Sequence, residues 1–537
     1  MSRVANQESA DTVYLRPEVK IEPLACGWYA WPYLVTPAQL AMNLKFRFLP
    51  LMQSFMSNPA VHAAAGSDPK LFAGPFVTLS SNEVPRVRQL FDETLSRCSD
   101  LMALAEALKQ LDSLLQETAS GFSLNEFYQK LPQPLQGLVE LTYDLNNHPA
   151  IRVLEELLYD EQITAHTQEI FLAPIPERER TFFMNTPRLS SPESMTFKMR
   201  FSDQRLDTLA AMRTRPKSFK SVADLFDVPE GDMATFRRLF TSTPPQSANG
   251  REYAGDGTRV RYFGHACVLV QTASTAVLFD PTFAVEPADD GRLTFNDLPE
   301  FIDYVVLTHS HQDHFCPEML LQLRHRVGRV VIPRNNSGSI ADPSLKLALR
   351  ELGYHNVEIM DFFDTLSIPD GEIVSLPFAG EHCDLNIYSK HAILLTIKER
   401  KLMFLVDSDG RDVALYRRLM RRISSVDALF LGMECEGGPL NWLYEALLTK
   451  PISRKNNESR RLCGSDSERA WNIWQEVKAP HVFIYAMGQE PWMRHLMGLE
   501  YDADSIQLKE SDKFIARCIE AGAKAERLFI SRELLWS

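Results

Sequence analysis

The densest group of side chains able to bind a metal or move a proton lies between residues 308 and 314. The run reads Thr-His-Ser-His-Gln-Asp-His and holds three of the 13 histidines, His309, His311 and His314, together with Asp313. Imidazole and carboxylate are ligands of divalent transition metals, and a short loop after a strand aims several of them at one point. Such a dense cluster predicts a metal site rather than four unrelated side chains.

A further carboxylate follows another strand-like segment. The metal-binding run comes directly after the apolar residues 304–307, and Asp407 comes directly after the apolar residues 402–406. Asp407 is therefore a further ligand-type side chain at the end of a strand-like segment. Asp409, just before Gly410, has the pattern of a turn residue.

A third strand-like segment is followed by two adjacent ligand-type residues. Glu381 and His382 both come shortly after the strand-like residues 373–376, and either could bind. With Glu381 bound, the site holds three protein carboxylates, and such anionic oxygen ligation favours iron or manganese over zinc. With His382 bound, the site is richer in nitrogen and favours zinc. The choice between them decides which chemistry the site supports.

The elements that must position these residues differ between the two halves of the chain. Turn and linker residues gather at 241–250, and beyond them short β-like runs alternate with helical ones. We therefore predict a helix-rich domain over residues 1–245 and an α/β domain over residues 246–537. Apolar spacing predicts an amphipathic helix over residues 87–115, and two helices joined at a proline break over residues 135–158.

Composition excludes several classes of protein. The 537 residues carry a formal net charge of −13, which argues against a nucleic-acid-binding protein, and no apolar run is long enough to span a membrane. The first 20 residues lack the apolar segment of a secretory signal, and eight scattered cysteines form no CxxC pair. We expect a cytoplasmic protein with reduced thiols.

The histidine run is the signature of the metallo-β-lactamase superfamily, which the carboxyl half resembles also in Gly264-His265-Ala266 and Asp280-Pro281. The resemblance implies an αββα sandwich with a dinuclear metal site at one edge of two sheets. It assigns His309 and His311 to one ion, Asp313 and His314 to the other, and a bridging position to Asp407. His265 precedes a strand at a turn, and no spacing links it to the metal, so we interpret it as structural.

The whole chain resembles a narrower family, the amino acid β-hydroxylases of chloramphenicol-type biosynthesis. The resemblance rests on residues 21–24, 27–31, 432–437 and 485–492. It implies a nonheme diiron oxygenase, with two iron ions and O2 as co-substrate, that hydroxylates an amino acid tethered to a nonribosomal peptide synthetase carrier domain. It completes the iron ligands with Glu381 and adds Glu434 as a nearby catalytic carboxylate. His481 and His495 are left out as ligands.

The same resemblance implies the partners. The amino-terminal domain is assigned dimerisation and recognition of the carrier or substrate, which predicts a homodimer. No glycine-rich nucleotide loop is present, so the electrons are expected from a separate donor protein. A basic run is the predicted docking surface for an acidic carrier domain, and its members are Lys450, Arg454, Lys455, Arg460 and Arg461.

Three other readings remain open. A dinuclear zinc hydrolase, such as a lactonase or phosphodiesterase, shares every ligand except the choice between Glu381 and His382. A noncatalytic protein with a structural metal predicts little effect when Glu381 is replaced. A diiron nitric oxide or dioxygen reductase usually has an acid where this chain has His311.

Overall fold

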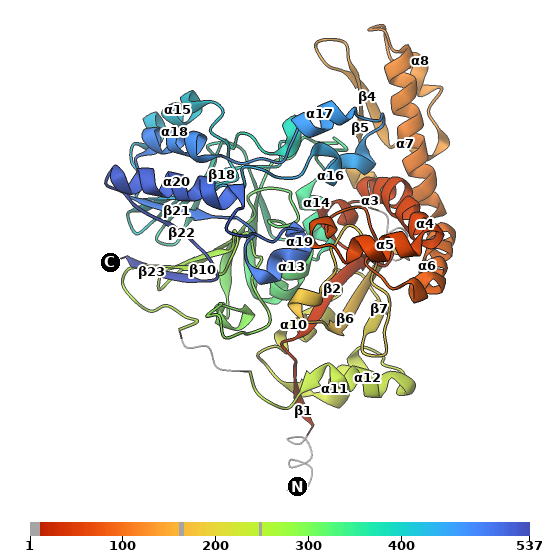
Figure 1. The fold of residues 1–537 in the computed structure, drawn as a ribbon, viewed down its shortest axis with the longest axis horizontal. Coiled ribbons are helices and arrows are strands. Elements are labelled where there is room, and N and C mark those ends of the chain that lie inside the picture. The colour runs from red at the N-terminus through yellow and green to blue at the C-terminus, as the bar shows by residue number, and fades with distance from the viewer. Residues whose placement is uncertain (1–10, 160–165, 246–249, 537) are drawn as a thin grey trace.

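The computed structural model describes residues 11–159, 166–245 and 250–536 (Figure 1). Residues 1–10, part of the segment examined for a secretory signal, lie outside the described residues. So do residues 246–249, which adjoin the predicted domain boundary. None of the helices in the described ranges combines the length and apolar content needed to cross a membrane.

The carboxyl half is built on two seven-stranded sheets. The first has the strand order β15-β14-β13-β12-β11-β10-β23, with bounds Val357–Met360, Val327–Pro333, Ile302–Val306, Ala276–Phe279, Val268–Gln271, Thr258–Tyr262 and Arg532–Trp536. The second has the order β16-β17-β18-β19-β20-β21-β22, with bounds Thr365–Ile368, Gly371–Leu376, Ala392–Ile397, Arg400–Val406, Ala428–Gly432, His481–Tyr485 and Lys524–Arg527. The last strand, β23, pairs with β10 and so returns the chain to the first sheet.

The two sheets pack face to face around a buried apolar layer. Phe404 of the second sheet stacks on Phe279 of the first, with ring centroids 4.1 Å apart, and on its neighbour Phe430 at 4.5 Å. Helices α15 (Val413–Ile423), α18 (Ser467–Val477) and α20 (Ile506–Glu520) share a core with the outer face of the second sheet. Helices α13 (Pro317–Leu323) and α14 (Leu345–Glu351) share a core with the outer face of the first sheet. The predicted αββα sandwich is confirmed.

The amino half is helix-rich and contains a four-stranded sheet of order β3-β2-β6-β7. Its main strands are β1 (Thr12–Leu15), β2 (Val19–Ala25), β3 (Trp28–Tyr29), β4 (Val139–Tyr143), β5 (Pro149–Val153), β6 (Gln168–Pro174), β7 (Met195–Lys198), β8 (Lys217–Ser218) and β9 (Phe240–Thr241). Its helices include α2 (Pro32–Val35), α3 (Pro37–Asn43), α4 (Leu49–Ser57), α5 (Pro59–Gly66), α6 (Val84–Arg97), α7 (Ser99–Thr118), α8 (Asn125–Tyr128), α10 (Arg205–Ala211), α11 (Phe219–Leu225) and α12 (Met233–Arg238).

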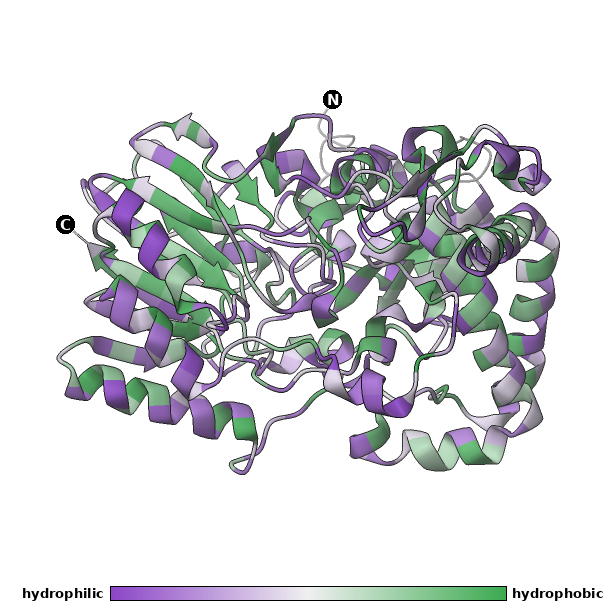
Figure 2. Ribbon diagram, turned by 90° about the horizontal axis from the view of Figure 1, so that it is seen from above, coloured by the Kyte–Doolittle hydropathy of each residue, from purple (hydrophilic) through white to green (hydrophobic). Residues whose placement is uncertain are grey.

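One apolar core runs through both halves. Strand β2 and helix α10 contact α13, helix α2 contacts α14, and their buried residues belong to one cluster. Figure 1 shows the amino-terminal helices beside α14, and Figure 2 shows green, hydrophobic strands inside the molecule with two-coloured helices around them. The amino half therefore packs on the helical layer of the first sheet, close to the loop that follows β13.

Two local predictions in the amino half need correction. The apolar pattern over residues 87–115 belongs to two helices, α6 and α7, which are separated at Cys98 by a non-helical backbone (φ −117°, ψ 29°). The two helices predicted over residues 135–158 are wrong, because β4 and β5 form a hairpin there. Val139 and Leu141 are buried with an exposed residue between them, which is the two-residue period of a strand. Asn147 (φ 62°) accommodates the left-handed turn that the hairpin requires.

Candidate metal centre

The predicted ligands meet at one edge of the two sheets, where several strands end. The histidine loop follows β13, Asp407 follows β19, and Glu381 comes five residues after β17. Strands β12 and β13 run parallel, as do β19 and β20, so the loops after them lie at the same ends of their sheets. The sheet topology therefore brings together side chains that are up to 98 residues apart, from His309 to Asp407.

The first group of ligand-type atoms consists of His309, His311 and Glu381, whose atoms lie within 4.8 Å of one another. His311 Nδ1 is 2.7 Å from Glu381 Oε1, and His309 Nε2 is 3.8 Å from Glu381 Oε2. The carboxylate is aimed by a run of left-handed residues, with φ of 57° at Glu381 and 34° at His382. Such backbone is costly for residues with a side chain and is found mostly at functional sites.

The second group lies beside the first and shares a carboxylate with it. Asp313 Oδ2 is 3.6 Å from His314 Nε2, and Asp407 Oδ2 is 3.2 Å from the same nitrogen. Asp407 Oδ2 is also 3.6 Å from His309 Nε2, so this carboxylate stands between the two groups. Gly432 makes room for it, because a Cβ at that position would come within 2.5 Å of Asp407 Oδ1.

Several of these atoms are buried and have no hydrogen-bond partner in the protein. They are His309 Nε2, His314 Nε2, Glu381 Oε2 and Asp407 Oδ1. A buried polar atom without a partner costs about 1–3 kcal/mol, and more when it is charged. Burial lowers the pKa of His309 well below its usual value, which keeps the ring neutral as a metal ligand must be. The unpaired, converging donors fit two bound cations.

Asp280 fixes the orientation of His314 and of the loop that carries it. Its Oδ2 lies 2.9 Å from His314 Nδ1, and its Oδ1 accepts a hydrogen bond of 2.8 Å from the Thr308 N–H. A carboxylate behind a ligating imidazole sets its tautomer and leaves the other nitrogen for the metal. Sequence reasoning noted Asp280 only as part of a motif, although its position after a buried strand was a usable signal.

Tyr444 performs the corresponding task for His311. It ends helix α16 (Leu440–Tyr444), and its hydroxyl lies 3.0 Å from His311 Nε2. Since Nδ1 of the same ring faces Glu381, the hydrogen bond to Tyr444 holds the ring between two partners. Sequence reasoning missed Tyr444, and 133 residues separate it from His311 with no motif to connect them.

His265 lies in the metal centre, although no spacing along the chain links it to the histidine loop. Its Nε2 is 3.2 Å from Asp313 Oδ2, and it forms a potential metal-binding group with Asp313 and His314. However, its Nδ1 accepts a hydrogen bond of 3.0 Å from the Gly488 N–H. In a neutral ring the proton is then on Nε2, where it faces Asp313. This geometry makes His265 a donor to a ligand rather than a ligand.

The remaining histidines lie outside the groups found among the described residues. The His382 ring stacks on His311 with centroids 4.2 Å apart, and its Nδ1 lies 2.9 Å from Glu381 Oε2. His382 thus borders the first group, and Glu381 supplies the ligand-type atom within it. His481 begins β21 and packs against Trp536. His495 is buried in the amino half's interface, where its Nδ1 lies 3.0 Å from the Trp492 carbonyl oxygen.

A cavity of about 270 Å³ opens onto these carboxylates. It is lined by His311, Asp313, Glu381 and Asp407, and also by the half-buried Glu434. Burial and the neighbouring carboxylates raise the pKa of Glu434 well above its usual value. We call this space the metal cavity, and it places Glu434 beside the two groups.

Comparison with known proteins identifies the family. A domain described as "Diiron non-heme beta-hydroxylase N-terminal domain" matches residues 14–244, and a β-lactamase superfamily domain matches residues 259–375. A hydroxylase of Streptomyces venezuelae, named 4-amino-L-phenylalanyl-[CmlP-peptidyl-carrier-protein] 3-hydroxylase, is 35% identical over 97% of this chain and 99% of its own. The chain belongs to the diiron β-hydroxylase family.

Solved structures agree with this assignment. The crystal structure of the diiron β-hydroxylase CmlA from Streptomyces venezuelae matches with a TM-score of 0.90 and 34% identity, over 98% of this chain and 99% of that one. A single-substitution variant of CmlA matches with a TM-score of 0.89 and 33% identity, over 98% and 100% of the two chains. The predicted family, fold class and enzyme class are confirmed, and the hydrolase reading is less well supported.

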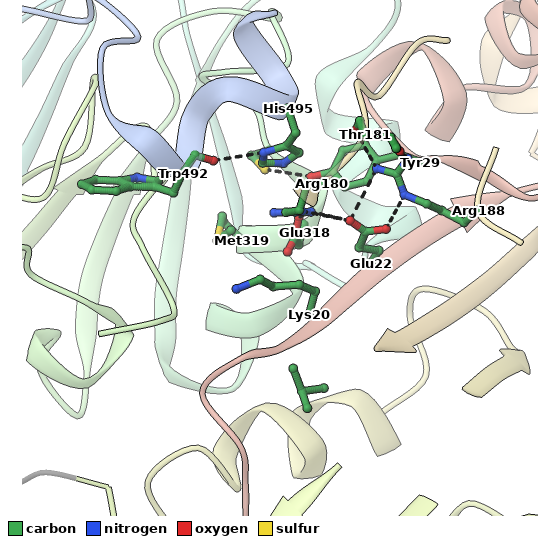
Figure 3. Close-up of polar contacts among 12 residues, drawn as sticks. Lys20, Glu22, Tyr29, Arg180, Thr181, Arg188, Glu318, Met319, Trp492 and His495 are labelled. Carbon is green, nitrogen blue, oxygen red and sulfur yellow. Dashed lines mark hydrogen bonds and ion pairs between the residues drawn. The ribbon is translucent and has the colours of Figure 1, made fainter. Parts of the chain in front are cut away.

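In this β-hydroxylase a buried network of ion pairs joins the amino half to the helix behind the metal loop (Figure 3). Glu22 of β2 accepts hydrogen bonds of 2.6 Å from both Arg180 and Arg188. Arg180 also donates to Glu318 of α13 at 2.6 Å, and the Tyr29 hydroxyl donates to Glu318 at 2.8 Å. Helix α13 begins three residues after His314. We call Glu22, Arg180, Arg188 and Glu318 the interdomain ion cluster.

Proposed function

We propose that this protein is an O2-dependent diiron monooxygenase that hydroxylates the β-carbon of an amino acid tethered as a thioester to a nonribosomal peptide synthetase carrier domain. The Streptomyces venezuelae relative is named for 3-hydroxylation of a carrier-bound amino acid. The observation that carries the proposal is the set of overlapping buried ligand groups, in which Glu381 joins His309 and His311, and Asp407 joins His309 and His314.

The donor set divides between two iron ions. His309, His311 and Glu381 would hold one ion, Asp313 and His314 the other, and Asp407 would serve both. Three carboxylates make the set rich in anionic oxygen, which suits iron better than zinc. When bound, the two ions supply activation of O2 and oxidation of a C–H bond, which no side chain can perform.

The protein side chains orient the ligands and shield the site. Asp280 holds the proton on His314 Nδ1, so that Nε2 keeps its lone pair toward Asp407. Tyr444 holds His311 from the side away from Glu381. Glu434 borders the same cavity, and we propose that it acts beside the ions as a further catalytic carboxylate. Trp442, Leu462 and Met497 line the cavity and exclude bulk water from it.

The decisive test is oxygen incorporation into a tethered amino acid. Carrier domains loaded with different amino acids are incubated with iron-loaded, reduced enzyme and air, and their intact masses are measured. We expect a gain of one oxygen atom on one candidate, with no gain without O2 or with Glu381→Gln. Zinc instead of iron in the purified protein, together with ester hydrolysis and no oxygen gain, would contradict the proposal.

The carrier domain is proposed to dock near helix α17 (Arg454–Ser459). Two members of the predicted basic run form hydrogen bonds within the protein. Arg460 donates to the Cys383 carbonyl at 2.8 Å, and Arg461 donates to the Gly437 carbonyl at 2.9 Å. Both are half-buried, whereas Lys450, Arg454 and Lys455 are exposed and available to an acidic partner.

Charge reversal tests this docking surface. Arg454→Glu with Lys455→Glu is expected to weaken carrier binding and to reduce its dependence on salt. Lys217→Glu with Lys220→Glu is the matched control, because both lysines are exposed in the amino half. Carrier affinity that is equal for the two double variants would remove the docking surface from the proposal.

Other proposed features follow the family resemblance. We propose a homodimer, a separate protein as electron donor and a cytoplasmic location. Size-exclusion chromatography with light scattering tests the dimer, and reconstitution with purified ferredoxins and their reductases tests the donor.

A further inference from the structure

A second cavity lies against the metal cavity, on the side of the amino half. It has a volume of about 610 Å³, and it shares the wall residues Ala73 and Trp442 with the metal cavity. Volumes of this size are typical of sites that bind extended small molecules. We call it the outer cavity, and it forms a second chamber beside the metal cavity.

The amino half supplies most of the outer cavity's wall. Its lining comes from the segments 46–54, 73–76 and 182–185, and the carboxyl half adds residues 439–445 around α16. The domain that distinguishes this family from the hydrolases of the β-lactamase superfamily therefore builds a chamber beside the metal site. One stretch of the lining belongs to a π-helix, Leu44–Phe48, a form that occurs frequently at functional sites.

Arg47 of this π-helix ties the two halves of the wall together. Its guanidinium donates hydrogen bonds to the Trp442 carbonyl at 3.0 Å and to the Leu443 carbonyl at 3.2 Å. Its Nη1 also lies 3.1 Å from the sulfur of Met184, which lines the same cavity. The guanidinium therefore holds together wall segments from both halves of the chain.

The partition between the chambers is an aromatic wall that glycines make possible. A Cβ at Gly438 would come within 3.0 Å of the Trp442 ring, and one at Gly498 within 2.4 Å of Ala73. Trp442 also packs against Phe182, with ring centroids 5.9 Å apart. Trp442 and the His311 partner Tyr444 lie on the same short helix, which connects the wall between the chambers to the metal ligands.

We propose that the outer cavity binds the pantetheine arm of the carrier, and that the amino acid passes Trp442 and Ala73 to enter the metal cavity. This inference rests on the proposed function, because a free amino acid has no arm to fill the second chamber. The arm combines amides with apolar methyl and methylene groups, which match the guanidinium of Arg47 and the aromatic wall. Helix α17, with the exposed Arg454 and Lys455, packs beside α16, so a docked carrier would stand next to this chamber.

Disulfide exchange tests the placement without requiring turnover. The variant Ser54→Cys places a thiol on the outer cavity, and Ser57→Cys places one on the exposed end of the same helix as a control. The probe is a carrier domain whose pantetheine thiol is activated as a pyridyl disulfide. Attack by the cysteine thiolate forms a protein–pantetheine disulfide and releases pyridine-2-thione, which is followed by its absorbance.

We expect Ser54→Cys to react at least about tenfold faster than Ser57→Cys, because a bound arm makes the exchange effectively intramolecular. Wild-type protein measures the background from its own cysteines. Equal rates for the two variants would overturn the inference whether or not the enzyme hydroxylates its substrate. Failure of the proposed function alone would appear instead as selective exchange without any oxygen incorporation.

A second measurement uses the catalytic reaction. Ser54→Trp fills the mouth of the outer cavity, and Leu145→Trp, on the fully exposed tip of the β4–β5 hairpin, is the control. The KM for aminoacyl-carrier is expected to rise at least about tenfold in Ser54→Trp, with iron content unchanged. An unchanged KM in Ser54→Trp, or equal changes in the two variants, would count against arm binding.

Discussion

Two buried clusters of charged side chains lie close together in this β-hydroxylase, and they differ in how their polar atoms are satisfied. In the interdomain ion cluster, both oxygens of Glu22 accept hydrogen bonds from arginines. In the metal centre, Asp407 Oδ1 has no hydrogen-bond donor, and Glu381 Oε2 lies 2.9 Å from His382 Nδ1 and 3.8 Å from His309 Nε2. Glu318 Oε1 of the ion cluster also lacks a partner, but the carboxylates of that cluster face arginines, whereas those of the metal centre face imidazoles. The cluster without permanent cations is the one that a bound cation would stabilise.

In both clusters the pKa of the carboxylates depends on burial and on the charge of the neighbouring side chains. Although burial opposes its charge, Arg188 and Arg180 hold the pKa of Glu22 at about 2. Burial raises the pKa of Asp407, with His314 acting in the opposite direction. Although burial opposes their charge, neighbouring histidines lower the pKa of Asp313 and Glu381, whereas permanently charged arginines do so for Glu22. The kind of cation beside each carboxylate is therefore the difference between the clusters, and four predictions test it.

The largest expected effect comes from Asp407→Asn compared with Asp409→Asn. Asp407 lies between the two ligand groups, whereas Asp409, two residues later, is paired with Arg411 at 2.6 Å and Arg469 at 2.7 Å. We expect Asp407→Asn to lose iron and all measurable hydroxylation while its metal-free form keeps its stability. Asp409→Asn should keep its iron and lose stability. Iron analysis and urea unfolding measure both, and iron loss in Asp409→Asn alone would reverse the interpretation.

Removing a cation from the ion cluster should destabilise the fold. Arg180→Met removes a positive charge that pairs with the buried carboxylates of Glu22 and Glu318. The loss is expected to lower the free energy of unfolding by about 3–5 kcal/mol. The loss should be the same with and without iron. Arg178→Met, at an exposed position two residues earlier, is the control. A loss below about 1 kcal/mol would show that the ion cluster is dispensable.

The orienting carboxylate should have an intermediate effect, on metal affinity. Asp280→Asn weakens the partner of His314 Nδ1 and is expected to reduce iron affinity by about 10- to 100-fold. The rate of iron transfer to a chelator measures the change. Asp303→Asn, at the start of the neighbouring strand β13, controls for loss of a carboxylate elsewhere in the sheet. Unchanged iron transfer in Asp280→Asn would make the contact incidental.

The smallest effect is a pH dependence. Since the folded-state pKa of Glu22 is lowered from 4.5 to about 2, its contribution to stability is fully present above pH 4.5. This contribution is about 3 kcal/mol in total, and it is lost as pH falls through about 2. The difference in unfolding free energy between metal-free wild type and Glu22→Gln should therefore be constant from pH 8 to about 5.5. A difference that shrinks within this range would contradict the assignment.

Some features of the site were predictable because they are local. His309, His311, Asp313 and His314 lie within one loop, so their spacing alone predicts that they converge. Asp407 was also predictable, because a carboxylate directly after a buried strand lies at the sheet edge. The hairpin of β4 and β5 was not recognised, because short apolar runs fit the helical period as well as the strand period.

Local spacing and the pattern of strand-like runs determined the histidine cluster and the layered α/β domain, and the resemblance to known families gave the αββα fold, the β-hydroxylase family and Glu381 as a ligand. Only the tertiary structure showed how Glu381 reaches His309 and His311, because a left-handed backbone aims its carboxylate at them. It also brought Tyr444 and His265 to the centre from distant segments. Distances between such residues depend on sheet order and domain packing, which spacing along the chain does not record.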